Sequence, residues 1–95
     1  MERRLAAIMA ADVVGYSRLI RADEEGTIAA LKTLRGDLID PKIAEHHGRI
    51  VKLMGDGMLV EFPSVVDAVR AALETQQAVT ERNAGLSEDE RIEFT

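Results

Sequence analysis

The chain opens with an apolar run of about the length of one strand. Residues 5–14 are apolar apart from Asp12, and such a run predicts a central strand that is buried on both faces. A buried helix is the competing interpretation, because alanine is frequent in the run. The break at Gly15-Tyr16-Ser17 favours the strand.

From Asp23 onward the periodicity becomes helical. The acidic residues at 23–25 suit a helix start, because carboxylates there lie at the positive end of the helix dipole. Apolar residues then recur three or four positions apart, which predicts one apolar helix face. These residues are Ile28, Leu31, Leu34 and Leu38.

The second half of this helix is expected to be irregular. Gly36 and the Asp40-Pro41 pair indicate a break or kink, because a proline disfavours helical geometry at the residue before it. Ile39 and Ile43 continue the apolar stripe beyond the break. Gly48 is then expected to form the C-terminal cap, a position that glycine often takes.

Two strand-like runs follow at 49–53 and 58–62, joined by Met54-Gly55-Asp56-Gly57. This composition is typical of a hairpin turn. Ser64, with Asp67 three residues later, resembles a capping box and predicts another helix, which reaches about residue 82. Its apolar positions are Val65, Val69 and Leu73. Residues 83–90 form a polar loop, and residues 91–95 begin a further strand.

The predicted order of elements is β-α-β-β-α-β in one domain of 95 residues. Short, right-handed connections turn this order into an α+β fold, a ferredoxin-like split βαβ antiparallel sheet with both helices on one face. The first and third strands then lie side by side at the centre. The end of the first strand, with Asp12, is therefore expected to lie beside the turn at 55–57.

Composition narrows the possible functions. The net charge of −5 argues against a protein that mainly binds nucleic acid. The absence of cysteine excludes disulfides, zinc–thiolate sites and thiol nucleophiles. No apolar run approaches the ~20 residues that span a bilayer, and the apolar stretch at 5–11 is short for a signal peptide. We therefore expect a cytoplasmic domain without membrane insertion.

Two carboxylates stand out. Asp12 closes an otherwise apolar strand, where a charge is costly unless it is paired, hydrogen-bonded or bound to metal; the alternative is that it caps the turn at Gly15. Asp56 alone fits ordinary turn chemistry. Brought together at one sheet edge, the two would repel unless cations lay between them, and such oxygen ligands suit Mg²⁺ or Mn²⁺.

Two other patterns are weaker. In Gly15-Tyr16-Ser17 a glycine stands before a helical start, which frees backbone N–H groups to face an anion, although such turns are also common without a ligand. The adjacent pair His46 and His47 is not predicted to bind metal, because neighbouring side chains on a helix point in different directions.

The segments Ala11-Asp12-Val13-Val14-Gly15-Tyr16-Ser17 and Lys52-Leu53-Met54-Gly55-Asp56-Gly57 together resemble the paired signature of class III adenylate and guanylate cyclases. The first is similar to the family's strand ending Asp-(Ile/Val)-x-Gly-(Phe/Tyr)-(Ser/Thr), and the second to its Lys-x-x-Gly-Asp hairpin. The similarity extends through essentially the whole chain. Within the family, the chain most resembles the adenylate cyclases of bacteria.

The resemblance implies a role for each matched residue. Asp12 and Asp56 would bind two Mg²⁺ or Mn²⁺ ions, with the carbonyl group of Val13 as a further ligand. The backbone at 15–17 would contact the triphosphate of ATP. Lys52 would donate a hydrogen bond to the adenine ring, where guanylate cyclases typically carry glutamate. Without the resemblance, Lys52 would be interpreted as a solvated strand residue.

The family's domain continues beyond this length. Its later part carries an acidic partner for the adenine amino group, and an asparagine and an arginine that act on ribose and phosphate. The resemblance therefore implies the N-terminal portion of an enzyme that converts ATP to 3′,5′-cyclic AMP and pyrophosphate, with the active site between two subunits of a homodimer. The alternatives are a non-catalytic binding or dimerisation module, and a diguanylate cyclase, whose acidic Gly-Gly hairpin signature is missing here.

Overall fold

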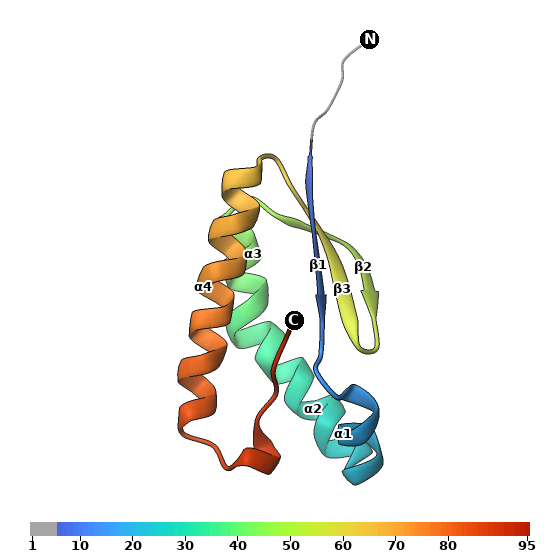
Figure 1. Cartoon of the computed structure of the whole chain (residues 1–95). Coiled ribbons are helices and arrows are strands. Elements are labelled where there is room, and N and C mark those ends of the chain that lie inside the picture. The colour runs from blue at the N-terminus through green and yellow to red at the C-terminus, as the bar shows by residue number, and fades with distance from the viewer. Residues whose placement is uncertain (1–5) are drawn as a thin grey trace.

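Residues 6–95, which the computed structural model describes, form a three-stranded antiparallel sheet with helices on one face (Figure 1). Leu5, the first residue of the predicted first strand, lies outside the described residues. The elements in chain order are β1 (Ala7–Asp12), α1 (Tyr16–Ala22), α2 (Glu24–Leu34), the π-helical segment η1 (Arg35–Ile39), α3 (Asp40–Glu45), β2 (Arg49–Met54), β3 (Gly57–Phe62), α4 (Val65–Ala84) and the 3-10 turn η2 (Glu88–Glu90).

The sheet has the order β1-β3-β2, and both of its strand pairs are antiparallel. This arrangement confirms the predicted ferredoxin-like topology. The expectation that the first strand is buried on both faces is wrong, because exposed and half-buried residues alternate along β1 and Ile8 is 59% exposed. The helices cover only one face of the sheet, so every second residue of β1 points into solvent.

The C-terminal segment lies along the free edge of β1. The amide of Asp12 donates to the carbonyl oxygen of Thr95 at 3.0 Å, and the amide of Thr95 donates to that of Asp12 at 2.9 Å. Val13 and Phe94 form an isolated antiparallel bridge. The strand predicted at 91–95 is therefore present only as an extended segment with one bridge. It lies where the fourth strand of a ferredoxin-like sheet belongs.

The predicted break near Gly36 and Pro41 takes the form of a π-helical turn within a continuous helical path. The amide of Asp40 donates to the carbonyl oxygen of Arg35, five residues earlier, and Asp40 itself is helical with φ −59° and ψ −43°. The expectation that the residue before the proline leaves the helix is therefore wrong. The wider turn accommodates a proline ring that would otherwise collide with the preceding turn.

The end of α3 is capped differently from the prediction. His47, at φ 63°, takes the left-handed conformation, and the amides of Gly48 and His47 donate to the carbonyl oxygens of Ile43 and Ala44 at 2.8 and 3.1 Å. This is a Schellman cap with histidine where glycine is usual. Gly48 is required for another reason, because a Cβ atom there would lie 2.5 Å from the ring of Phe62.

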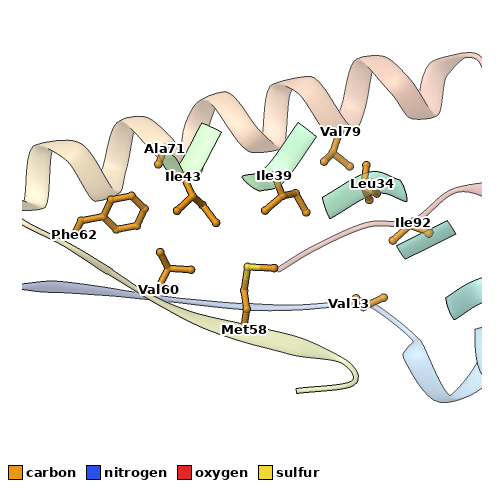
Figure 2. Packing of buried hydrophobic residues seen from close by; sticks show 10 residues of the cluster. All are labelled: Val13, Leu34, Ile39, Ile43, Met58, Val60, Phe62, Ala71, Val79 and Ile92. Carbon is orange, nitrogen blue, oxygen red and sulfur yellow. The ribbon is translucent and has the colours of Figure 1, made fainter. Parts of the chain in front are cut away.

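The hydrophobic core lies between the sheet and the helices (Figure 2). It consists of Val13, Leu34, Ile39, Ile43, Met58, Val60, Phe62, Ala71, Val79 and Ile92. Ser64 caps α4 as predicted, since its side chain accepts a hydrogen bond from the amide of Asp67 at 3.1 Å.

The helix α4 carries aliphatic residues on its outer face as well as on the face that it turns to the core. Ala71 and Val79 are buried, whereas Val65, Val69 and Leu73 are 70%, 50% and 67% exposed. The spacing of these three residues correctly indicated a helix, but they form its outer stripe. Within the described residues, none of the helices has the length and apolar character needed to cross a membrane.

Candidate metal and nucleotide site

The end of β1 and the β2–β3 turn are joined directly. Asp12 pairs with Gly57 in the register of β1 and β3, and the amide of Val13 donates to the carbonyl oxygen of Asp56 at 2.7 Å. The topology predicted from the sequence therefore brings Asp12 and the turn that carries Asp56 to the same end of the sheet.

Gly57 lies immediately beneath the carboxylate of Asp12. A Cβ atom at Gly57 would come within 2.5 Å of Asp12 Oδ1 and 2.6 Å of the carbonyl oxygen of Ala11. Contacts this close are not sterically allowed, so only glycine leaves room for the carboxylate over the strand. The backbone contact with Ala11 is the stricter of the two, and the glycine also leaves the space above β3 that the Asp12 carboxylate occupies.

The oxygen atoms at this end of the sheet suit a hard cation. Asp12 and Asp56 are both exposed, and neither carboxylate has a hydrogen bond or ion pair with another described residue. The carbonyl oxygen of Val13 likewise accepts no hydrogen bond within residues 6–95. Two unpaired carboxylates and one free carbonyl oxygen form the kind of donor set that Mg²⁺ or Mn²⁺ prefers.

The turn that follows β1 depends on Gly15. This residue is left-handed, with φ 65° and ψ 32°, and its carbonyl oxygen accepts from the amide of Leu19 at 3.1 Å to start α1. Tyr16 and Ser17 lie in the first turn of α1, in agreement with the helical start expected after Gly15, although the predicted order of elements began its first helix only near Asp23. The guanidinium of Arg18 also lies here, 3.3 Å from the position of a Cβ atom on Gly15.

Arg18 is a candidate that the sequence analysis missed. It brings a cation to the turn at Gly15, next to the backbone amides of the first turn of α1. Its three-residue spacing from Gly15 places it one helical turn along, but arginine on a helix surface is too common for that spacing to have indicated a role.

A bulge in β2 determines where Lys52 points. Ile50 pairs with Val60, and the register then shifts so that Lys52 pairs with Leu59. Without the extra residue Lys52 would lie opposite Met58, on the face that the helices cover. The bulge instead moves Lys52 to the open face of the sheet. Asp12, paired with Gly57, lies on this same open face.

A second charged cluster joins α3 to α4 on the other side of the molecule. Ligand atoms of Glu45, His46 and Glu74 lie within 4.8 Å of one another. The ammonium of Lys42 already bridges the two carboxylates at 3.2 and 3.1 Å, and Glu74 Oε2 lies 2.9 Å from His46 Nε2. These groups are therefore an ion-pair network. The two histidines do not converge, since His46 faces α4 and His47 is exposed.

The network shifts the ionisation of its members. The hydrogen bond from Lys42 is the main cause that lowers the pKa of the Glu74 carboxyl below its usual 4.5, and the imidazole of His46 beside it acts in the same direction. Hydrogen bonds to Glu74 and Glu45 raise the pKa of the Lys42 ammonium above 10.5. Each shift favours the charged form of the group, because the neighbouring opposite charge stabilises it.

The chain is similar in sequence to a curated protein of Rhizobium meliloti (strain 1021) named "Putative adenylate cyclase 3". The two are 48% identical over 92 residues, which is 97% of this chain and 16% of that protein. The crystal structure of an adenylate/guanylate cyclase/hydrolase from Silicibacter pomeroyi is also 48% identical and superposes with a TM-score of 0.80. The match covers 99% of this chain and 54% of that one.

Two further solved structures have the same fold. The guanylyl cyclase Cya2 is 28% identical with a TM-score of 0.72, over 94% of this chain and 50% of that one. A bacterial light-regulated adenylyl cyclase has a TM-score of 0.79 over 94% of this chain and 49% of that one; at 12% identity it supports the fold alone. No family model matches the chain. The chain thus spans about half the length of these structures and less of the curated relative.

Proposed function

Because the chain is homologous to adenylate and guanylate cyclases over nearly its whole length, we propose that it is the N-terminal portion of a class III cyclase catalytic domain. Its reaction would be the conversion of ATP to 3′,5′-cyclic AMP and pyrophosphate. The observation that supports this proposal best is the hydrogen bond from the amide of Val13 to the carbonyl oxygen of Asp56, at 2.7 Å. It holds the two unpaired carboxylates of Asp12 and Asp56 at one end of the sheet.

The metal-binding part of the proposal rests on Asp12, Asp56 and the carbonyl oxygen of Val13. These three oxygen donors would hold two divalent cations, Mg²⁺ or Mn²⁺. When bound, such cations would lower the pKa of the ribose 3′-hydroxyl and neutralise charge on the departing pyrophosphate. The chain's own contribution is to fix the donors in place, which Gly57 and the β1–β3 register do.

The turn at 15–17 would hold the phosphates. Gly15 ends the strand in a conformation that lets α1 begin at once, so the amides of Tyr16 and Ser17 have no acceptor within the helix. Arg18, whose guanidinium lies over Gly15, would add positive charge to this turn. Backbone donors and one arginine suit a polyphosphate better than they suit an uncharged ligand.

Lys52 would select the purine. An ammonium group only donates hydrogen bonds, so it fits the ring nitrogen of adenine and opposes the ring N–H of guanine. Its position on the open face of the sheet leaves its ammonium group uncovered by the helices, so it is free to reach a substrate. In the homodimer that the resemblance implies, metal-binding carboxylates of one subunit and the base-contacting lysine of the other would share a site. An ATP substrate would fit a cytoplasmic location.

A non-catalytic cyclase-like module is the second candidate, because the chain spans only about half of its solved relatives. The metal carboxylates, Gly57 and Lys52 favour the catalytic proposal, since a module that only binds a protein partner has no need of all of them. The two candidates differ in whether the chain binds a metal–nucleotide complex through Asp12 and Asp56.

The experiment is a calorimetric titration of the chain with ATP in the presence of Mn²⁺. The chain should bind weakly, and the double variant Asp12→Asn, Asp56→Asn should bind at least about tenfold more weakly, because two charge-assisted contacts are lost. The matched control is Asp37→Asn, Asp40→Asn, which removes two exposed carboxylates from the helix and should leave the affinity unchanged. Equal affinity in all three proteins would favour the non-catalytic module.

A further inference from the structure

A cavity of about 260 Å³ lies beneath the β2–β3 turn, and its walls come from the hairpin, α1, α2 and the C-terminal segment. Most of its wall is apolar, from Ile28, Leu31, Met54, Met58 and Phe94. Met58 belongs to the core face of the sheet (Figure 2), so the cavity lies on the side that the helices cover. It is smaller than the roughly 300–1,000 Å³ of typical drug-sized sites, which limits the size of an occupant.

Two cations from α2 and η1 stand at this cavity. Lys32 and Arg35, three residues apart and therefore neighbours on the helix surface, both line it. Neither forms an ion pair with a carboxylate whose side chain the structure describes. An apolar cavity with two unpaired cations is complementary to an apolar anion.

The cavity is distinct from the candidate metal site but shares a wall with it. Asp12, Asp56 and Lys52 do not line the cavity, whereas Tyr16, Gly55 and Gly57 do. The phenol oxygen of Tyr16 lies against the turn, 3.2 Å from the position of a Cβ atom on Gly55. The turn that carries Asp56 thus separates the two sites.

We propose that this cavity is a second binding site, for a small apolar carboxylate such as a short fatty acid. The hydrocarbon part would lie against Leu31 and Met58, and the carboxylate would pair with Lys32 and Arg35. The proposal does not depend on cyclase activity, because it concerns binding alone.

The test is a titration of the ¹⁵N-labelled chain with sodium octanoate, and separately with octan-1-ol, followed by amide shifts in NMR spectra. Octanoate should bind saturably and shift the amides of Gly55 and Gly57. It should bind about fivefold more tightly than octan-1-ol, because partly exposed ion pairs contribute modestly to affinity. The double variant Lys32→Gln, Arg35→Gln should remove this difference and leave octan-1-ol binding within about twofold.

A second variant tests the space itself. Ile28→Trp adds a large ring from a position that is 45% exposed, so it should fill the cavity and abolish binding of both probes while the spectrum stays folded. Arg70→Gln, which removes a charge from α4 away from the cavity, should bind octanoate like the unaltered chain. Equal affinity for octanoate and octan-1-ol, shifts confined to the outer stripe of α4, or competitive displacement of octanoate by Mn²⁺–ATP would each overturn the proposal.

Discussion

The carboxylate of Asp12 lies directly over Gly57, so close that a Cβ atom on the glycine would be 2.5 Å from Asp12 Oδ1. Asp12, a proposed metal ligand on β1, therefore has room above β3 because Gly57 carries no side chain. This relationship can be tested without any assay of activity, because it affects both folding and metal binding.

Gly57→Ala should destabilise the chain by about 1–3 kcal/mol, the usual cost of overpacking, and should weaken Mn²⁺–ATP binding by displacing Asp12. Urea denaturation and calorimetry measure the two effects. The matched control is Gly36→Ala, because nothing lies within 4 Å of a Cβ atom there. That helical substitution should be neutral or stabilise by up to about 1 kcal/mol. A Gly57→Ala protein as stable as the control would show that Asp12 is free to move.

The 95-residue chain alone is expected to make no measurable cyclic AMP. The resemblance places the residues that act on ribose and transition-state phosphate in the later part of the domain, and this chain covers 54% of the Silicibacter pomeroyi structure. Incubation with ATP and Mn²⁺ followed by chromatography provides the measurement. Robust turnover would mean that residues within the chain supply those functions.

Lys52→Glu should lower ATP turnover at least about tenfold in a protein extended to the full length of the solved relatives. A glutamate would accept from guanine but oppose adenine, and a mismatched buried polar group costs ~1–3 kcal/mol. Rates with ATP and GTP should be compared under identical Mn²⁺. Lys42→Glu is an unsuitable control because it breaks an ion-pair network; Arg70→Glu, on exposed α4, is the better one. An unchanged ATP-to-GTP preference in Lys52→Glu would leave Lys52 as a solvated strand residue.

The ion-pair network of Lys42, His46 and Glu74 should make stability depend on pH. The pKa of Glu74 is lowered in the folded chain. The contribution of Glu74 to the free energy of unfolding is therefore complete above the usual pKa of 4.5, and it is lost as pH falls through the lowered value. The raised pKa of Lys42 gives the opposite limit: its contribution is complete below 10.5 and is lost as pH rises through the raised value.

The measurement is the unfolding free energy of the chain and of Glu74→Gln between pH 3 and pH 7. The two proteins should differ most near neutral pH and converge at the acid end. Glu81→Gln, which alters an exposed carboxylate on the same helix without touching Lys42, should run parallel to the unaltered chain. A constant difference between the chain and Glu74→Gln across this range would contradict the assignment.

The outer stripe of α4 should tolerate polar residues. Val69→Ser and Leu73→Ser should each change stability by no more than about 0.5 kcal/mol, as surface substitutions usually do. Val79→Ser on the same helix should cost about 1–3 kcal/mol, because it buries a hydroxyl and removes packing from the core. Thermal unfolding distinguishes these outcomes. Comparable losses at Leu73 and Val79 would indicate that the stripe is covered in solution.

The proximity of Asp12 to the turn that carries Asp56 was predictable, because it follows from the topology alone. Once the elements were ordered β-α-β-β-α-β, the end of the first strand had to meet the turn before the third. The face on which Lys52 lies was not predictable in the same way. It depends on one bulged residue between Ile50 and Lys52, and a bulge leaves no reliable mark on an alternating pattern.

The orientation of α4 was hidden for a different reason. Its exposed aliphatic residues follow helical spacing as well as its buried ones do, so periodicity indicates the helix but not which of its faces packs on the core. The cap of α3 is a similar case. Sequence rules assign the left-handed position to Gly48, whereas His47 occupies it, and Gly48 instead leaves room for the ring of Phe62.

The π-helical turn at 35–39 also explains how Leu34, before the turn, and Ile39, at its end, contribute to the same core. Leu34 and Ile39 are both buried although five residues apart, a spacing that would put them on different sides of a regular α-helix. Hydrogen bonding from Asp40 to Arg35 across five residues absorbs one surplus position. Relative to a regular α-helix, the segment contains one additional residue, and the π-helical turn accommodates it. Deleting one residue of this turn would restore regular α-helical phasing, and Gly36 is a suitable choice because a Cβ atom there would have nothing within 4 Å.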